Sequence, residues 1–493
     1  WRSVYMTFSA HYAFKSRYIA DFSIRRDGTT KFGDNKRWGN FPALSFRWNV
    51  VDEPWMRGTQ KWLSMLSLRP GWGRVGSQPT DEYLFFSKYT GTDSYNGANS
   101  IYPSNIRLSN LQWEEKETWN VGFDLGLFNN MITADFNIYT QMTSKLLMRD
   151  VKLPSSSGFS SLSWTNVGKM RNNGWEFNVN GTDVVKVGKF RLGFNVTFAN
   201  NKNEIVEMDP TALSSLNKDF DNKNGSYLTR IQLNNPFGAI YGFRYKGVYQ
   251  YSDYSDVEVP GVSGPNAPVA RDENGNVIRD KAGFTIPMVF GYDKTTNTEL
   301  YEFQGGDAIY EDINHDGNIN ELDIVYLGSS LPKITGGWGL KFSYGRWSLN
   351  AQFNFRVGNK VINEARMNAE SMYNNNNQAA SVNWRWRTEG QLAEIPRALY
   401  NKGFNYLGSD RFVEDASFMR LNYLSLGYSL NPKLLRRIGV TSLSINLNAS
   451  NLFCLTNYSG ADPEVSYGGM NVATDGAKTP RSRQFTARVQ IGF

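Results

Sequence analysis

The sequence predicts an all-β protein, an antiparallel β-barrel that crosses a membrane. Three observations support this fold class. Apolar and polar residues alternate in many segments, several of these segments reach about ten residues, which is the length of a tilted membrane-spanning strand, and short turns alternate with long connections along the chain. The chain has 493 residues, 40% of them hydrophobic and 14% aromatic. We interpret residues 1–493 as one domain, a partial outer-membrane barrel with long extracellular loops.

Residues 347–357 give the clearest alternation. Successive side chains of a strand point to opposite faces, so this segment predicts one apolar and one polar face. The apolar face carries Trp347, Leu349, Ala351, Phe353, Phe355 and Val357, and the polar face carries Ser348, Asn350, Gln352, Asn354 and Arg356. The pattern recurs at 6–12, 119–127, 132–139, 190–198, 443–450 and 485–493. Within 419–428 the alternation changes phase, which predicts a β-bulge.

A soluble β-sandwich also alternates, and three features favour the membrane barrel over it. The segments are longer than the usual strands of soluble sheets. The polar face carries amides, Arg and Asp, as expected beside a water-filled lumen, where a soluble surface would carry Lys and Glu throughout. Aromatic residues stand at the ends of the apolar face, as in the interfacial girdles of outer-membrane barrels. They are Trp119, Trp175, Tyr344, Trp347 and Tyr428.

Turn and loop lengths predict the topology. Tight turns are expected at Asn129-Asn130 and Gly345-Arg346, because Asn and Gly tolerate positive φ. Long connections are expected at roughly 71–112, 148–172, 204–236, 359–415 and 453–481. We count about fifteen strands, one of which lies unplaced between residues 251 and 334. The last strand ends on Phe493, which resembles the C-terminal signal of the barrel-assembly machinery. A periplasmic C-terminus places residue 1 at the extracellular side, so further strands would precede this chain.

Composition excludes several other classes. No stretch reaches the ~18 apolar residues that a membrane-spanning helix needs. A single cysteine, Cys454, and two histidines, His11 and His315, leave little material for a Cys or His metal site. The net charge of +7 is spread along the chain and forms no basic stripe for nucleic acid. No Ser/His/Asp set, P-loop or paired acids stand out, so we expect no enzyme.

One motif predicts a metal site. Residues 312–323 follow the spacing of an EF-hand-type loop, in which short oxygen-bearing side chains surround Ca²⁺ and a glycine allows the sharp turn. The predicted ligands are Asp312, Asn314, Asp316, Asn318 through its carbonyl, and Asp323. Asp323 replaces the usual glutamate, so bidentate binding is less assured. The alternative is that the same sequence forms an Asx-rich turn, which is stabilised by its own backbone hydrogen bonds and holds no metal. The ion would have a structural role.

The long connections are rich in aromatic residues. Flat rings stack on sugars and pack against peptide side chains, so we list candidates for substrate binding. They are Tyr83, Tyr89, Tyr95, Tyr373 and Trp384. The alternative, which is the more frequent role of any single loop aromatic, is that these rings pack loops together or contact a partner protein.

Several segments, in this order, resemble one family, the SusC/RagA-type TonB-dependent transporters. The segments are Arg25–Gly33 (RRDGTTKFG), Trp38–Pro42 (WGNFP), Asp52–Met56 (DEPWM), Trp113–Trp119 (WEEKETW), Asn166–Glu176 (NVGKMRNNGWE), Asn451–Phe453 (NLF) and Tyr458–Glu464 (YSGADPE). The resemblance implies a barrel of about twenty-two strands in the outer membrane of a Gram-negative bacterium, of which this chain is the C-terminal part. The family's N-terminal plug and TonB box are absent from this chain.

The resemblance also implies a function and partners. Members import large nutrients, here an oligosaccharide or a peptide, in a TonB-dependent way. A SusD-like surface lipoprotein closes the mouth, and the remaining plug and barrel part, the assembly machinery and outer-membrane lipid are further partners; nucleic acid is not one. The alternatives are a siderophore or cobalamin receptor, a passive porin or adhesin, and, least favoured, a barrel enzyme.

Overall fold

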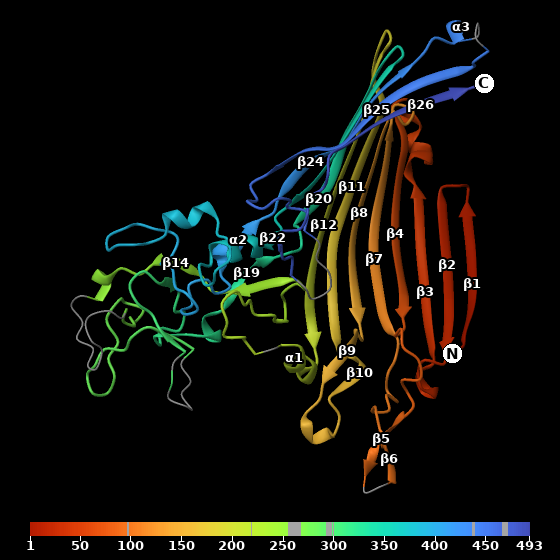
Figure 1. Ribbon diagram of the computed structural model, residues 1–493. Helices are drawn as coiled ribbons and strands as arrows, with labels where there is room; N and C mark the ends of the chain where they lie inside the picture. Colours follow the sequence, from red (N-terminus) through yellow and green to blue (C-terminus); the bar gives the residue numbers. More distant parts are fainter. Residues whose placement is uncertain are drawn as a thin grey trace.

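Thirteen antiparallel strands form one curved sheet (Figure 1). In the computed structural model, residues 96–97, 218, 255–267, 292–297, 299, 436–438 and 466–471 are not described. In sheet order, the strands are β1 (Ser3–Phe14), β2 (Tyr18–Thr29), β3 (Trp38–Asn49), β4 (Leu63–Ser77), β7 (Glu114–Leu127), β8 (Ile132–Ser144), β11 (Gly168–Val187), β12 (Phe190–Met208), β20 (Ile334–Tyr344), β21 (Trp347–Val357), β24 (Phe418–Ser429), β25 (Ser442–Thr456) and β26 (Gln484–Gly492). The sheet confirms the predicted all-β class.

The predicted strand count of about fifteen is too high for the described residues, and the strand expected between 251 and 334 is not in this sheet. Strand β12 pairs directly with β20, from Phe190 opposite Tyr344 to Ala199 opposite Thr335. The described part of 251–333 instead forms strands of two to five residues, which pair with one another and with β13 and β14. Such short strands are too brief to show a membrane-spanning alternation.

The two ends of the sheet differ, as the turn pattern predicts. One end has short connections, including 15–17, 128–131, 188–189 and 345–346. The other end has the long ones, 78–113, 145–167, 209–333, 358–417 and 457–483. Asn129 and Asn130 have φ of 57° and 60°, and Gly345 has φ of 61°, which confirms that these turns need residues tolerant of positive φ. The N-terminus lies at the long-loop end and the C-terminus at the short-turn end (Figure 1).

The predicted bulge is present in β24. Leu421 pairs with Phe353, whereas Tyr423 pairs with Gln352, so Asn422 is the extra residue. This insertion moves the apolar positions from odd to even numbers and keeps them on one face.

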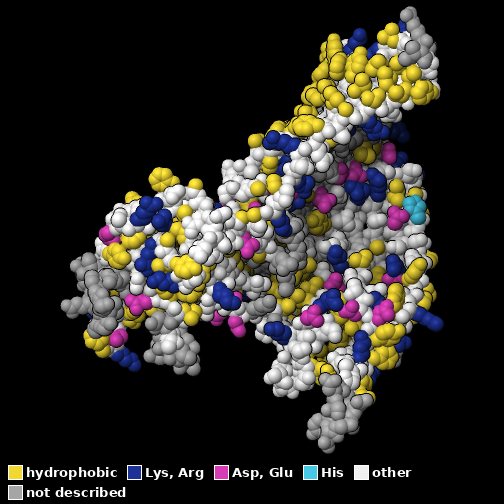
Figure 2. Space-filling model, in the orientation of Figure 1, with side chains coloured by type: hydrophobic (Ala, Val, Ile, Leu, Met, Phe, Trp, Pro, Cys, Tyr) yellow, Lys and Arg dark blue, Asp and Glu magenta, His cyan; other side chains and the backbone are white. Residues whose placement is uncertain are grey.

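Aromatic side chains mark both ends of the apolar face. At the short-turn end, the rings of Trp347 and Tyr428 lie 4.6 Å apart, and Tyr344 pairs with Trp347. At the long-loop end, Trp72 and Trp119 lie 5.9 Å apart. Figure 2 shows hydrophobic side chains over the upper ends of the strands, near the C-terminus, and charged side chains of both signs on the concave side.

The concave face is polar, as predicted for a lumen. Asp124 of β7 accepts hydrogen bonds from Arg47 Nη2 at 2.7 Å, Arg69 Nη2 at 2.6 Å and Ser67 Oγ at 2.8 Å. These four residues come from three neighbouring strands. Two guanidinium groups and one hydroxyl thus stabilise one carboxylate whose side chain is 11% exposed.

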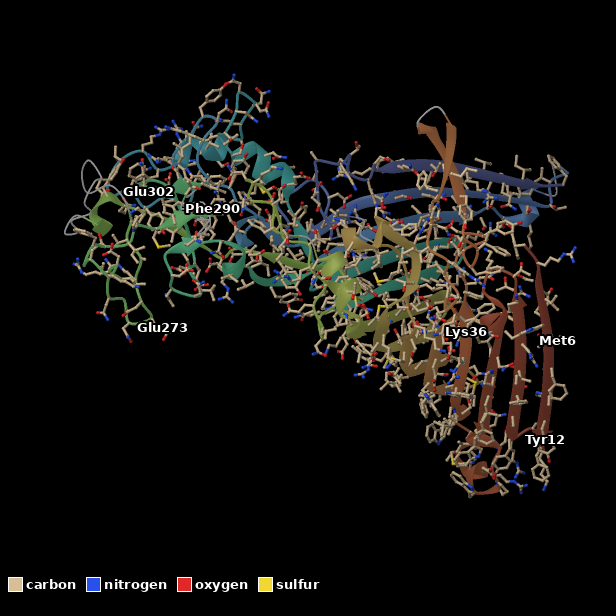
Figure 3. All side chains as sticks on the ribbon, turned by 90° about the horizontal axis from the view of Figure 1, so that it is seen from below. Met6, Tyr12, Lys36, Glu273, Phe290 and Glu302 are labelled. Atoms are coloured by element: carbon tan, nitrogen blue, oxygen red, sulfur yellow. The ribbon has the colours of Figure 1, made fainter. Side chains whose placement is uncertain are left out.

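The long connections carry the remaining elements. Residues 209–333 and 358–417 build a loop domain beside the long-loop end of the sheet (Figure 1), with Phe290 inside it and Met6 and Tyr12 on β1 at the far edge (Figure 3). Its elements are α1 (Pro210–Leu216), β13 (Ala239–Gly242), β14 (Tyr245–Val248), β15 (Val289–Phe290), β16 (Tyr301–Glu302), β17 (Ala308–Tyr310), β18 (Asn318–Ile319), β19 (Val325–Ser329), β22 (Lys360–Ile362), α2 (Glu364–Glu370) and β23 (Val413–Asp415). Elsewhere lie β5 (Tyr89–Tyr95), β6 (Ala98–Pro103), β9 (Leu147–Lys152), β10 (Ser161–Asn166) and α3 (Pro432–Leu435).

The loop domain has its own hydrophobic core. Phe243, Phe290, Phe303 and Leu407 have no exposed surface, and Tyr310 is 2% exposed. Because this core is formed by residues of the loop domain themselves, the domain keeps a defined shape beside the sheet.

The orientation of the faces leads to a prediction about Leu447, which lies on the outer face of β25 and is 53% exposed. Leu447→Arg is expected to destabilise the barrel in lipid by about 2–4 kcal/mol, because a charge at the bilayer midplane is poorly solvated. The measurement is the unfolding free energy in bilayers. Ser425→Arg, on the lumenal face of the neighbouring strand, is the control, and equal losses for both variants would contradict the orientation.

Phe493 follows β26 directly, and its side chain is 88% exposed. Its role as an assembly signal stays a prediction. Deletion of Phe493 is expected to lower the amount of assembled protein in the outer membrane, whereas Phe493→Tyr, which keeps a terminal aromatic ring, is expected to assemble normally. Heat-modifiable migration of outer-membrane extracts measures this, and normal assembly after the deletion would refute the signal role.

Candidate functional site

A cleft of about 800 Å³ opens on the loop domain. Five segments from two long loops form it: β14, α2, the 3₁₀ turns Ala380–Trp384 and Asp410–Phe412, and residues 392–395. Since both major loops contribute, the cleft exists only when residues 209–333 and 358–417 pack together. Its lining combines charged groups, one tyrosine and apolar side chains.

Glu370, at the end of α2, is the centre of the cleft floor, and its side chain is 5% exposed. The carboxylate accepts hydrogen bonds from Arg411 Nη2 at 2.7 Å, Arg366 Nε at 3.2 Å and Ser381 Oγ at 3.0 Å. Arg366 also binds Glu414 Oε1 at 3.0 Å. Each of these charges has a partner, which a buried charge requires to remain ionised.

Tyr245 of β14 forms one wall. Its hydroxyl donates to the carbonyl of Glu394 at 2.7 Å, and the Arg411 guanidinium lies 5.3 Å from its ring centre. Burial raises the pKa of Tyr245 to about 12. The phenol is therefore neutral at physiological pH and acts as a hydrogen-bond donor.

The rim of the cleft is apolar and open. Trp384 is 78% exposed and Leu392 is fully exposed. Large exposed apolar side chains beside a cleft are typical of surfaces that contact a ligand or another protein. The arrangement suits binding, in which the apolar rim supplies contact area and the fixed charges of the floor select polar groups.

The structure separates the five aromatic residues predicted for substrate binding. Trp384 lines the cleft, and Tyr373 packs against Tyr406 with ring centres 5.8 Å apart. Tyr83 and Tyr89 are exposed on the loop between β4 and β7, which lies apart from the loop domain (Figure 1). Tyr95 ends β5, and its side chain lies outside the described part. Sequence reasoning missed Glu370, Arg411, Arg366 and Leu392, since isolated charges and aliphatic residues in long loops carry no pattern.

The predicted calcium loop folds as a sharp turn that is held by hydrogen bonds from its backbone N–H groups to its own carboxylates. Asp312 accepts the N–H groups of Asp316 and Gly317 at 3.3 and 2.8 Å, and Gly317 has φ of 79°. Asp323 is fully buried and accepts the N–H groups of Ile313 and Asn320 at 2.8 and 2.9 Å. Burial raises the pKa of Asp323 to about 6, and Asp312 and Asp316 add to the effect.

These donors have the oxygen chemistry that calcium prefers. Within the described residues, however, no three His, Cys, Asp or Glu side chains gather as a metal cluster. The carboxylates alone would therefore not complete the ligand set of an ion. The amide oxygen of Asn314 and backbone carbonyls would be needed as further ligands. The structure leaves the calcium prediction untested.

The segment Tyr458–Glu464 connects the loops to the sheet. Asp462 accepts from Arg420 of β24 at 2.6 Å, and Glu464 accepts from Arg481 at 2.7 Å and lies 3.8 Å from Arg356 of β21. Tyr458 is buried and donates to Asp475 at 2.7 Å. These contacts fix Tyr458–Glu464 against β21 and β24, so the motif has a structural role here.

The comparisons with known proteins agree with this architecture. Residues 4–292 match the family "TonB dependent receptor-like, beta-barrel", which is more than half of the chain. The chain belongs to this family, whose members are outer-membrane receptors, and it is of the SusC/RagA type, as the resemblance implied. No helix in the described residues is long and apolar enough to span a membrane.

Individual relatives are consistent with this assignment. The chain is 28% identical to TonB-dependent receptor P39 of Formosa agariphila and 25% identical to TonB-dependent receptor SusC of Bacteroides thetaiotaomicron, with 98% of the chain aligned in both cases. It covers 45% and 43% of these two proteins, so it spans less than half of their length. The RagAB peptide transporter has a similar fold, with a TM-score of 0.73 at 24% identity over all of this chain and 48% of that one.

The buried charges of the cleft floor lead to a prediction. Glu370→Gln is expected to destabilise the loop domain by about 3–5 kcal/mol, because Arg411 and Arg366 then lose a buried carboxylate. Resistance of the loop domain to limited proteolysis at increasing urea concentration measures the loss. Glu394→Gln, an exposed position of the same cleft, is the control. Equal resistance of both variants would show that the ion pairs do not hold the floor.

Proposed function

We propose that this chain forms part of a TonB-dependent importer of large nutrients, an oligosaccharide or a peptide, in the outer membrane of a Gram-negative bacterium. The observation that carries the proposal is the cleft, which lies on loops at the long-loop end of a sheet with a polar concave face. A ligand held there would be poised above a polar passage. The similarity to TonB-dependent receptor SusC supports the class of importer, and the similarity to the RagAB peptide transporter supports the peptide among the two cargoes.

The proposal includes three protein partners. A SusD-like surface lipoprotein would cover the loops, and Trp384 and Leu392 supply the exposed apolar area that such a contact needs. The remaining plug and barrel part would close the sheet, because unpaired strand edges are not tolerated in lipid. TonB would act through that part.

Uptake by cells tests the proposal. Labelled oligosaccharides and peptides are offered to cells with the intact gene, cells without it, and cells that lack TonB. Uptake of either class that needs both the gene and TonB supports the proposal. Uptake of ferric siderophores or cobalamin alone would favour the rival receptor class, and uptake that is independent of TonB would favour a passive pore.

The rim residues give a prediction for the same cargo. Once a cargo is found, Trp384→Ala is expected to weaken its binding about tenfold, as loss of an aromatic anchor does at other interfaces. Equilibrium binding to the purified protein measures this. Trp55→Ala is the control, because Trp55 is 66% exposed in a turn at the opposite end of the sheet. Unchanged affinity in both variants would show that the rim residue Trp384 is not part of the binding site.

We also propose that Ca²⁺ binds the 312–323 loop and has a structural role. The support is the ligand spacing and the gathering of Asp312, Asn314 and Asp316 around one turn. Removal of Ca²⁺ with a chelator is expected to speed proteolysis within this loop. Asp312→Asn keeps a hydrogen-bond acceptor and removes one charge, so this variant is expected to be proteolysed at the faster rate with or without the chelator. A chelator without effect on the unaltered protein would contradict the proposal.

A further inference from the structure

A second hollow lies on the outer, membrane-facing side of the sheet. It measures about 810 Å³ and is lined mainly by apolar surface from β3, β4, β7, β8, β11 and β12. It is separate from the cleft of the loop domain and from the lumen. We call it the outer groove.

Strand register explains how the groove arises. One outward row across the sheet runs through Trp72, Trp119, Thr140, Asn173 and Lys202. The next outward row, closer to the middle of the sheet, runs through Pro70, Val121, Ile138, Trp175 and Asn200. The first row has two tryptophans, on β4 and β7, and the second row has one, on β11. The smaller side chains between them leave the hollow.

The groove straddles the boundary between apolar and polar surface. The floor consists of Val121 and Ile138, which are 45% and 52% exposed. Thr140 and Asn173 lie at the polar side, where the threonine hydroxyl donates to the amide oxygen of Asn173 at 2.6 Å. This boundary is at the long-loop end of the strands, which corresponds to the outer leaflet of the membrane.

The tryptophans on one side are held in a fixed orientation. The indole N–H groups of Trp72 and Trp119 both donate to Glu117 Oε1, at 2.9 and 3.2 Å, and Glu117 binds Arg74 Nη2 at 3.1 Å. The polar edges of the rings are therefore satisfied by the protein, and their apolar faces remain available to hydrocarbon. A wall ordered in this way loses little side-chain entropy when a chain packs against it.

Charge at the polar side favours an anion. Lys202 Nζ and Arg171 Nη1 share a single carboxylate, that of Glu204, at 3.2 and 3.4 Å. Lys202 lines the groove, and its side chain is 71% exposed. One positive charge thus remains in excess at the point where a lipid headgroup would lie above the apolar floor.

We infer that the outer groove is a binding site for one acyl chain of a phosphorylated lipid of the outer leaflet, with the phosphate near Lys202. The apolar floor and the tryptophan walls contact the chain, and Lys202 with the polar groups of Asn173 and Thr140 contacts the headgroup. A lipid bound here would bridge six neighbouring strands, from β3 to β12, and would act as an annular ligand with a defined position.

The experiment measures lipid that stays with the transporter expressed from its own gene. The protein is extracted from outer membranes in a mild detergent, washed, and analysed for bound phosphorylated lipid by mass spectrometry. Lys202→Glu is expected to lower the retained phosphorylated lipid about fivefold, since one basic group at an anionic surface contributes an effect of that size. Trp175→Ala is expected to lower it as well. Trp347→Ala, in the aromatic group at the opposite end, serves as the control and is expected to retain the lipid.

Reconstitution separates the lipid phosphate from hydrocarbon alone. The unaltered protein and Lys202→Glu are placed in phosphatidylcholine vesicles with and without about 5 mol% lipid A. The fluorescence of Trp175 is obtained as the difference between each protein and the same protein with Trp175→Phe. A lipid A effect in the unaltered protein that disappears in Lys202→Glu supports the site. Equal retention in all correctly folded variants, or an equal response to both vesicle types, would overturn it and show adventitious hydrocarbon binding only.

Discussion

Hydrocarbon cannot hydrogen-bond to peptide groups, and the rest of this structure depends on that constraint. Within the sheet every interior strand pairs with two neighbours, and the pairing is antiparallel throughout. Once the backbone is satisfied in this way, the alternation of side chains follows, with Leu and Phe toward lipid and amides, Asp and Arg toward water. The bulge in β24 shows how strictly this alternation is kept, because one extra residue restores the correct face after a change of phase.

Charged groups in the protein are then placed where water or partners are available. Arg47 and Arg69 share Asp124 on the lumenal face, Arg411 and Arg366 share Glu370 beneath the loop cleft, and Arg420 is held by Asp462 at the mouth. Arg47, Arg411 and Arg420 each join strands or loops that are distant in sequence, whereas Arg366 binds Glu370 within α2. The guanidinium of arginine has several donors, so one side chain connects more than one element.

The sequence was sufficient to predict the sheet, because long strands repeat a simple period. Alternation located strands such as β7, β12, β21 and β25, Asn129 and Asn130 identified a tight turn, and the change of phase after Leu421 identified the bulge. It was insufficient for residues 251–334, where strands of two to five residues carry no period and a long-range core determines the path. The cleft could not be predicted from the sequence for the same reason. Glu370 and Tyr245 are ordinary residues in separate loops, and only the packing of those loops makes them neighbours. Trp384, one of the five loop aromatics predicted as candidates, lines the cleft, and its role in binding stays a prediction.

The independent core of the loop domain has a consequence for the effect of substitutions. Phe243, Phe290 and Tyr310 support the surface that faces the environment, whereas Leu447 and its neighbours support insertion into the bilayer. Substitutions on the surface of the loop domain are therefore expected to leave the strands of the sheet intact, because the two parts have separate hydrophobic contacts.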